Sequence, residues 1–161
     1  MEKTPMKLFL NPETAEKIKA HAAQAYPEEC CGLLIGAVPE DFGEPGARLH
    51  ADQSRPLANA WEGGAAGKRT RYSLDSLQFA KIERDLAATG RGVIGIYHSH
   101  PDVAAWPSPF DLDHAWPSYA YLIVSVRGGE VADERVWLRS EDGRAFTEGA
   151  VEVTPAQALL K

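Results

Sequence analysis

The amino-acid sequence predicts a single α+β domain in which a mixed β-sheet is flanked by helices. The first observation is length, because 161 residues build one domain with a real core but are too few for two comfortable ones. The second is composition, because 44% hydrophobic and 25% charged residues are typical of a globular chain, not of a disordered one or a disulfide scaffold. The third is that helical and strand-like segments mix without strict alternation, which favours a mixed sheet.

The first fifty residues are predicted to form a strand, a helix and two further strands. Residues 6–10 fit a short strand, and Asn11 and Pro12 then have the pattern of an N-cap followed by proline at the first helical position. Residues 31–38 form an apolar run short enough for a buried strand, and residues 48–51 could continue the sheet. The helix is expected to end near Tyr26, and its apolar face is formed by Ala15, Ile18, Ala22 and Ala25.

Residues 53–71 show the weakest pattern of regular structure and are predicted to form a long loop. The segment holds Pro56, Trp61 and three glycines. A loop of this length in a compact domain is usually functional or mobile. A second helix is expected to begin at Ser73 and to stop near Gly90, with one apolar stripe formed by Phe79, Ile82 and Leu86.

The C-terminal half is predicted to consist mainly of strands. Residues 93–98 have the composition of a strand, and residues 108–116 look like a short helix stopped by a proline. Residues 119–126 and 131–138 are two further strands, and the two glycines between them make this the clearest hairpin in the chain. Residues 146–153 could supply a last strand.

The charge and the cysteine content exclude several classes of function. A net charge of −6 lacks the basic footprint expected of a nucleic-acid-binding protein or of one that binds an anionic membrane. Cys30 and Cys31 are adjacent, which suits neither a disulfide nor a C-x-x-C site, so we expect packing residues in a reducing compartment. Neither a signal-peptide pattern nor a run of roughly 18 apolar residues is present, so we expect a cytoplasmic protein.

His98 and His100 are the first candidates for chemistry. They are two residues apart at the end of a predicted strand, so both imidazoles project from one face and can reach the same ion. A catalytic zinc ion takes three protein ligands and leaves a fourth position to water, and Asp111 is the candidate for the third ligand. Two histidines and one carboxylate also suit non-haem iron, so the ligand types alone leave the metal open.

Ser108 and Asp111 also have a purely structural explanation. Ser108 between two prolines has the pattern of a helix N-cap with Pro109 at the first helical position. Asp111 follows three residues later, and S-x-x-D resembles a capping box in which both side chains only satisfy free backbone N–H groups. Their spacing alone leaves both explanations open.

Taken together, these residues resemble a known motif. His98-x-His100-Pro101, with Ser108 and Asp111 following at set offsets, is similar to the zinc motif of the JAMM metalloproteases, also called the MPN+ or JAB1/Mov34 family. The family has an upstream glutamate three residues before the first glycine of a small-residue strand, and residues 27–36 resemble that segment. This rule selects Glu29 over Glu28, a choice that the residues alone leave open. The resemblance covers roughly residues 6–138 and is to the compact bacterial and archaeal members.

The resemblance implies a JAMM/MPN-like fold, related to the cytidine deaminases, over a single domain of residues 1–161. It implies one Zn2+ ion held by His98, His100 and Asp111, which would make hydroxide available near neutral pH. Glu29 would be the catalytic base that takes a proton from water and hands it to the leaving amine. Ser108 would share the developing oxyanion with the metal during hydrolysis of a peptide or isopeptide bond.

The implied substrate is a ubiquitin-like or sulfur-carrier protein, cleaved after the glycines of its C-terminal tail. Two alternatives are a metal-free MPN-type scaffold, which would have lost ligands that this chain keeps, and a hydrolase of a small amide or peptide conjugate. The H-x-E and P-C-x-x-C pattern of the nucleobase deaminases and the H-E-x-x-H pattern of the zincins are both missing from the sequence. The oligomeric state, a homodimer included, stays open. Candidates for lining a substrate groove are Trp61, Trp106 and Trp116, of which Trp116 could equally be a core residue.

Overall fold

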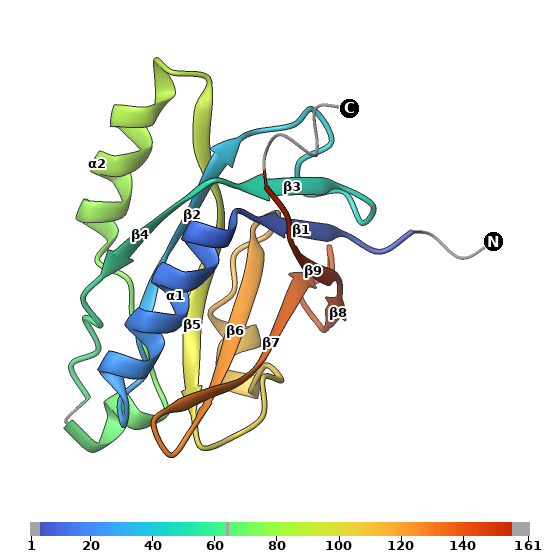
Figure 1. Ribbon diagram of the computed structural model, residues 1–161. Helices are drawn as coiled ribbons and strands as arrows, with labels where there is room; N and C mark the ends of the chain where they lie inside the picture. Colours follow the sequence, from blue (N-terminus) through green and yellow to red (C-terminus); the bar gives the residue numbers. More distant parts are fainter. Residues whose placement is uncertain (1–3, 64, 156–161) are drawn as a thin grey trace.

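The structure is a computed structural model that describes residues 4–63 and 65–155, and these form nine strands, three α-helices and one short 3-10 helix. The strands are β1 (Lys7–Leu10), β2 (Cys31–Ala37), β3 (Arg48–Ala51), β4 (Gln53–Leu57), β5 (Arg91–Pro101), β6 (Ala120–Arg127), β7 (Glu130–Arg139), β8 (Phe146–Glu148) and β9 (Ala150–Val153). Six of them form a larger sheet in the order β4-β2-β5-β6-β7-β8, and three form a smaller sheet in the order β3-β1-β9 (Figure 1). In the larger sheet only β5 and β6 pair in parallel, so the predicted mixed sheet is confirmed.

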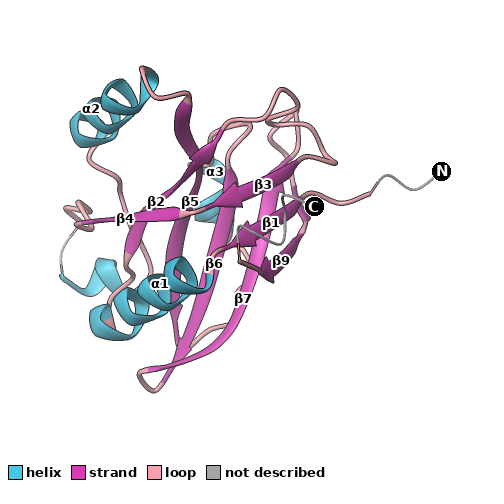
Figure 2. Ribbon diagram, turned by 45° about the horizontal axis from the view of Figure 1, so that its top comes forward, coloured by secondary structure: helices cyan, strands magenta, loops and turns pink. Residues whose placement is uncertain are grey.

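Two apolar clusters cover the faces of the larger sheet, and helices lie on both sides of its strands (Figure 2). On one face, Ile18 of α1 (Pro12–Ala25) packs in the same cluster as Leu34 of β2. On the other face, Ile82 of α2 (Ser76–Ala87) packs in the same cluster as Ile35 of β2. Successive strand residues point to opposite faces, so one strand contributes to both clusters. The third helix, α3 (Pro109–Asp113), follows β5.

The two long helices begin where local signals place them. Pro12 occupies the first turn of α1 after Asn11, as predicted. α2 begins three residues later than predicted, because Asp75 and not Ser73 is its N-cap. The Asp75 side chain accepts hydrogen bonds from the N–H groups of Leu77 and Gln78.

The prediction of one long loop over residues 53–71 is wrong at both of its ends. Residues 53–57 form β4, which pairs antiparallel with β2, and Ala65–Arg69 form the 3-10 helix η1. β4 is an edge strand with mostly exposed side chains, so it lacks the apolar alternation of a half-buried strand. An edge strand also tolerates Pro56, since one side of its backbone needs no partner.

Residues 48–51 and 146–153 also differ from the prediction. Residues 48–51 are β3, which pairs in parallel with β1 in the smaller sheet and does not continue the larger one. Gly149 divides residues 146–153 into β8, at the edge of the larger sheet, and β9, beside β1. A Cβ at Gly149 would collide with the Met6 carbonyl oxygen, so the chain passes between the sheets where only glycine fits.

Within the described ranges, every helix is too short or too polar to cross a membrane.

Candidate metal centre

His98 and His100 lie near the C-terminal end of β5, an inner strand of the larger sheet. Alternation along the strand puts both side chains on one face, and they are only 1% and 5% exposed. In the strand register, His98 lies opposite Cys31 of β2 and Ile123 of β6. Strands on both sides therefore fix the backbone that carries the two imidazoles.

Asp111 lies in the first turn of α3, where the capping explanation of its spacing is confirmed and its role as a metal ligand stays a prediction. Its N–H donates to Ser108 Oγ at 3.0 Å, and its Oδ2 accepts from the Ser108 N–H at 2.9 Å, which is a complete capping box. The same Oδ2 lies 3.4 Å from His98 Nε2 and 3.1 Å from His100 Nε2. One carboxylate thus caps the helix and faces both histidines.

We call His98, His100 and Asp111 the ligand triangle, and its dimensions fit one metal ion. The two histidine Nε2 atoms are 3.2 Å apart, and the donor atoms of all three residues lie within 4.8 Å of one another. Nitrogen and oxygen ligands about 2.0 Å from a tetrahedral zinc ion are about 3.3 Å from each other, which matches the observed spacing. His100 Nδ1 lies 2.9 Å from the Ala104 carbonyl oxygen, and donation to it leaves the Nε2 lone pair for the site.

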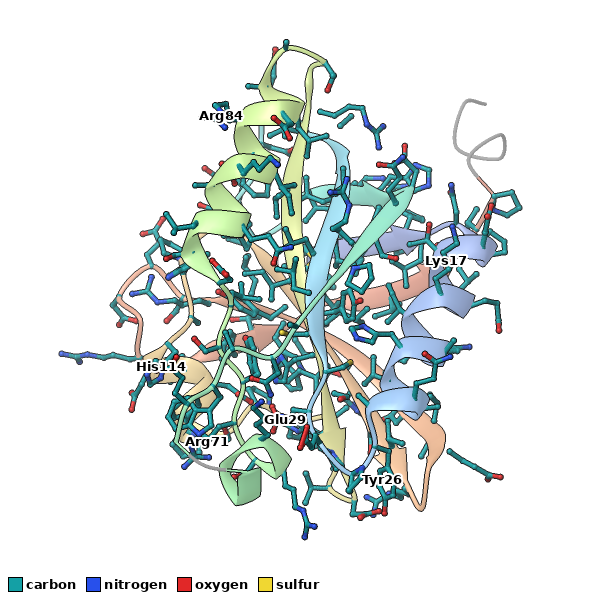
Figure 3. All side chains as sticks on the ribbon, turned by 90° about the vertical axis from the view of Figure 1, so that its left-hand side faces the viewer. Lys17, Tyr26, Glu29, Arg71, Arg84 and His114 are labelled. Atoms are coloured by element: carbon teal, nitrogen blue, oxygen red, sulfur yellow. The ribbon has the colours of Figure 1, made fainter. Side chains whose placement is uncertain are left out.

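Glu29 lies two residues before β2 (Figure 3), close enough to His100 and Asp111 for their charges to act on its carboxyl. The residue is 5% exposed, and its Oε1 has no hydrogen-bond partner among the residues that the structure describes. Burial raises the pKa of Glu29 to about 8, although the positive charge of nearby His100 opposes the shift. A buried polar atom without a partner is unfavourable, so this carboxyl is suited to meet a group that enters the site. Glu28, by contrast, is partly exposed.

The charges of the ligand triangle favour a cation. Burial lowers the pKa of His98. Burial acts in the same direction on His100, but its hydrogen bonds to Asp111 and to the Ala104 carbonyl raise its pKa above the ordinary value. Burial alone would raise the pKa of Asp111, yet the two histidines and the Ser108 N–H hold it well below its usual range. Asp111 is therefore an anion at neutral pH.

Ser99 and Tyr72 support the site, although the sequence did not single them out as functional. Ser99 Oγ accepts a hydrogen bond from the Cys30 N–H at 2.8 Å, which ties the residue after Glu29 to the strand that carries the histidines. The ring of Tyr72 stacks on His98, with centroids 4.4 Å apart and planes at 22°. The position of Ser99 between the histidines is a signal that could have found it, whereas no spacing rule connects Tyr72 with His98.

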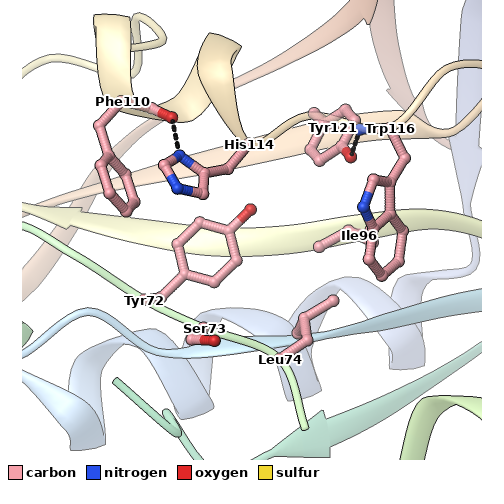
Figure 4. A pocket seen from close by; sticks show the side chains of 8 residues that line it. All are labelled: Tyr72, Ser73, Leu74, Ile96, Phe110, His114, Trp116 and Tyr121. Atoms are coloured by element: carbon pink, nitrogen blue, oxygen red, sulfur yellow. Dashed lines mark hydrogen bonds between the residues drawn. The ribbon is translucent and has the colours of Figure 1, made fainter. Parts of the chain in front are cut away.

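A cavity of about 160 Å³ lies among Tyr72, Phe110 and Trp116 (Figure 4). Two of its lining residues also contact or adjoin the triangle, since Tyr72 stacks on His98 and Phe110 precedes Asp111. Figure 4 shows the Tyr72 hydroxyl directed into the cavity. The lining residues are Tyr72, Ser73, Leu74, Ile96, Phe110, His114, Trp116 and Tyr121.

The three tryptophans considered for a substrate groove have different surroundings. Trp116 is 40% exposed and lines the cavity. Trp106 is 53% exposed and lies over Trp137, with ring centroids 4.9 Å apart. Trp61 packs edge-on against Phe110, which fixes its segment of chain against α3. Trp116 thus shares a cavity with Tyr72 and Phe110, whereas Trp106 lines a separate hollow with Ser108.

The three other histidines of the chain and its two cysteines lie outside the ligand triangle. His21, His50 and His114 each have a hydrogen-bond partner elsewhere in the fold. Cys30 and Cys31 are buried free thiols, as expected of packing residues.

Comparison with known proteins finds chains of similar sequence and similar fold. Residues 12–140 match the model of a family described as prokaryotic homologs of the JAB domain. A desampylase of Haloferax volcanii is 32% identical over 136 residues, which cover 81% of this chain and 89% of that one. A CysO-cysteine peptidase of Mycobacterium tuberculosis is 32% identical over 147 residues, covering 91% and 90% of the two chains. A solved JAB1/MPN domain protein from Archaeoglobus fulgidus has the same fold, with a TM-score of 0.53, 19% identity and coverage of 92% and 99%.

Proposed function

The chain belongs to the family of prokaryotic JAB-domain proteins, and from that premise we propose that it is a zinc-dependent peptidase acting on conjugates of a ubiquitin-like or sulfur-carrier protein. The observation that carries the proposal is the ligand triangle with the unpartnered carboxyl of Glu29 beside it. We propose further that residues 1–161 form one domain with this activity.

His98, His100 and Asp111 would hold the zinc ion through two nitrogens and one oxygen, a donor set that zinc accepts. When bound there, zinc supplies Lewis-acid chemistry and brings the pKa of a coordinated water toward about 7. Glu29 accepts the proton of the attacking water and returns it to the leaving amine. Burial raises the pKa of this carboxyl to about 8 in the metal-free chain, and a cation bound beside it would lower that pKa and favour the carboxylate that takes the proton.

Ser108 is proposed to stabilise the oxyanion that develops on the scissile carbonyl. Its Oγ accepts the Asp111 N–H through a lone pair, so the hydroxyl proton remains free to donate. A donor fixed in this way needs no reorganisation when charge develops during the reaction. Ser108 can therefore serve α3 as its cap and the substrate as a donor at the same time.

A glycine-rich tail is the substrate element that fits this site best. Glu29 and the three residues of the ligand triangle are between 1% and 7% exposed, so a scissile bond that reaches them needs small neighbouring residues. The cavity beside the triangle provides space for a larger side chain further along an extended tail. The two related enzymes, named desampylase and CysO-cysteine peptidase, support the same class of substrate.

Two measurements on the purified chain test the proposal. Elemental analysis of protein prepared without chelator should give one zinc per chain. Mass spectrometry should show cleavage after the terminal glycines of a carrier protein that is extended by a short peptide, and the Asp111→Asn variant should not cleave it. A metal-free, inactive protein would indicate the scaffold alternative. Cleavage of small amides but not of the carrier extension would indicate the small-amide alternative.

A further inference from the structure

Asn59 follows β4, and its side-chain amide makes four hydrogen bonds, all to backbone groups. Its Nδ2 donates to the carbonyl oxygens of Glu29 at 3.1 Å and Arg71 at 2.9 Å. Its Oδ1 accepts from the N–H groups of Trp61 at 3.1 Å and Ser73 at 3.2 Å. A primary amide has two donor hydrogens and two acceptor lone pairs, so every hydrogen-bonding position of the Asn59 side chain is used.

These four bonds join two parts of the site that are far apart in the sequence. Arg71 and Ser73 flank Tyr72, so Asn59 holds the backbone on both sides of the ring that stacks on His98. The bond to the Glu29 carbonyl holds the backbone that carries the buried carboxyl. One side chain thus contacts both the residue proposed as the base and the segment that packs on a metal ligand.

The backbone of Glu29 is otherwise attached to the same segment of chain. Its N–H donates to the Lys68 carbonyl oxygen at 2.7 Å, in the 3-10 helix η1. The carbonyl and N–H of Glu29 are therefore bonded to Asn59 and Lys68, whereas the histidines of the triangle lie in a strand paired on both sides. The position of the Glu29 carboxyl thus depends on how these two residues are held.

We propose that Asn59 is a positioning residue that sets the place of the Glu29 carboxyl at the metal centre. This inference rests on the proposed function, in which Glu29 is the base. The chemistry of the amide explains the choice of residue, because aspartate has the same shape but cannot donate. An aspartate at this position would face the carbonyl oxygens of Glu29 and Arg71 without a proton between them.

The test is the Asn59→Asp variant, with Asn11→Asp as a matched control. Asn11 precedes the N-terminal end of α1, whereas Glu29 follows its C-terminal end, and a helix of 14 residues is about 21 Å long. The Oδ1 of Asn11 contacts His50 Nε2 at 2.6 Å. On the carrier conjugate, Asn59→Asp should lower kcat by about 10- to 100-fold, since a base displaced by about 1 Å loses that much rate, while KM stays nearly constant. Zinc content should stay at one per chain, and Asn11→Asp should leave kcat unchanged.

A second readout needs neither activity nor metal. In chelator-treated protein, Asn59→Asp should speed hydrogen exchange of the Glu29 amide by about tenfold or more, because the segment that accepts its hydrogen bond opens more often. It should also shift the NMR signals of the His98 ring protons, because the Tyr72 ring stacked on them moves. Neither change is expected in Asn11→Asp.

A normal kcat in Asn59→Asp, or an unchanged Glu29 amide and His98 ring, would overturn the proposal. If the wild-type chain cleaves no carrier conjugate, the proposed function fails, while the exchange and NMR measurements still decide the role of Asn59. If Asn59→Asp does not fold, Asn59→Ser takes its place, since its hydroxyl retains one donor. The same changes in amide exchange and in the His98 signals are then expected, and their absence would overturn the proposal.

Discussion

The ligand triangle and Glu29 are held in place by different parts of the fold. His98, His100 and Asp111 all lie within residues 98–111, where a strand paired on both sides and a capping box fix them locally. Glu29 comes from a turn before β2, and its backbone bonds to residues 59–68. Metal binding should therefore depend on one short segment, while turnover should depend on contacts between distant ones. Variants that separate the two properties test this difference.

The largest effect is expected from Asp111→Asn. The change removes the one anion of the ligand triangle and places an amide near two imidazoles. Loss of a residue that only supports a metal ligand lowers affinity by up to about 100-fold. Loss of the charged ligand itself should therefore lower zinc affinity by more than about 100-fold, and cleavage should fall to background. Competition with a chromogenic chelator measures the affinity. Stoichiometric zinc bound as tightly as in the wild type would exclude Asp111 as a ligand.

Glu29→Gln should separate turnover from metal binding. The amide has nearly the same shape as the carboxyl but cannot accept a proton from water. We expect kcat to fall by about 10²- to 10⁴-fold, the usual contribution of a general base, with one zinc per chain retained. Steady-state kinetics together with elemental analysis check this, and wild-type turnover in the variant would remove Glu29 from the mechanism.

The metal-free protein should lose stability as pH rises, because of Glu29. Burial raises the pKa of this carboxyl from 4.5 to about 8, so between these values the folded chain binds more protons than the unfolded one. The free energy of unfolding then decreases with rising pH, and the contribution is lost above about pH 8. At about 1.4 kcal/mol per pKa unit, the loss is on the order of a few kcal/mol.

Denaturant unfolding in chelator between pH 5 and 8 measures this dependence. Glu29→Gln carries no titrating group at this position, so its stability should vary less with pH than that of the wild type. Identical slopes for the two proteins would show that Glu29 is not buried as an acid in the metal-free state.

The smallest effect is expected from Ser99→Ala. The buried Cys30 N–H loses its acceptor, which costs about 1–3 kcal/mol of unfolding free energy. Ser99 projects away from the ligand triangle, so zinc binding should remain while turnover declines through the neighbouring Glu29. Denaturant unfolding and zinc titration of the same sample check the two parts. A variant that loses zinc in proportion to its loss of activity would contradict the separation.

The ligand half of the site could be predicted from the sequence because its geometry is local. Alternation puts His98 and His100 on one face of any strand, and Ser108 with Pro109 fixes the start of α3. Membership of the JAB-domain family confirms the resemblance that those residues carry. The mixed sheet was also predictable, since most of its strands have a clear apolar pattern.

The position of Glu29 and the residues that support it could not be derived from the sequence in the same way. Glu28 and Glu29 both precede a strand, and only the three-dimensional burial of Glu29 distinguishes them physically. Asn59 and Tyr72 lie in or next to the segment that has no clear periodicity, and their partners are backbone groups and a ring far away in the chain. β4 was missed for a related reason, since exposed edge strands carry little apolar signal.

The capping box at the start of α3 also orders Asp111 in the metal-free protein. Because Ser108 and Asp111 satisfy each other's N–H groups, the helix start does not depend on an ion for its shape. A ligand that is ordered in advance loses little conformational entropy on binding. If Asp111 binds a metal ion as proposed, its carboxylate is in place before the ion arrives, and loss of the ion does not require the start of α3 to refold.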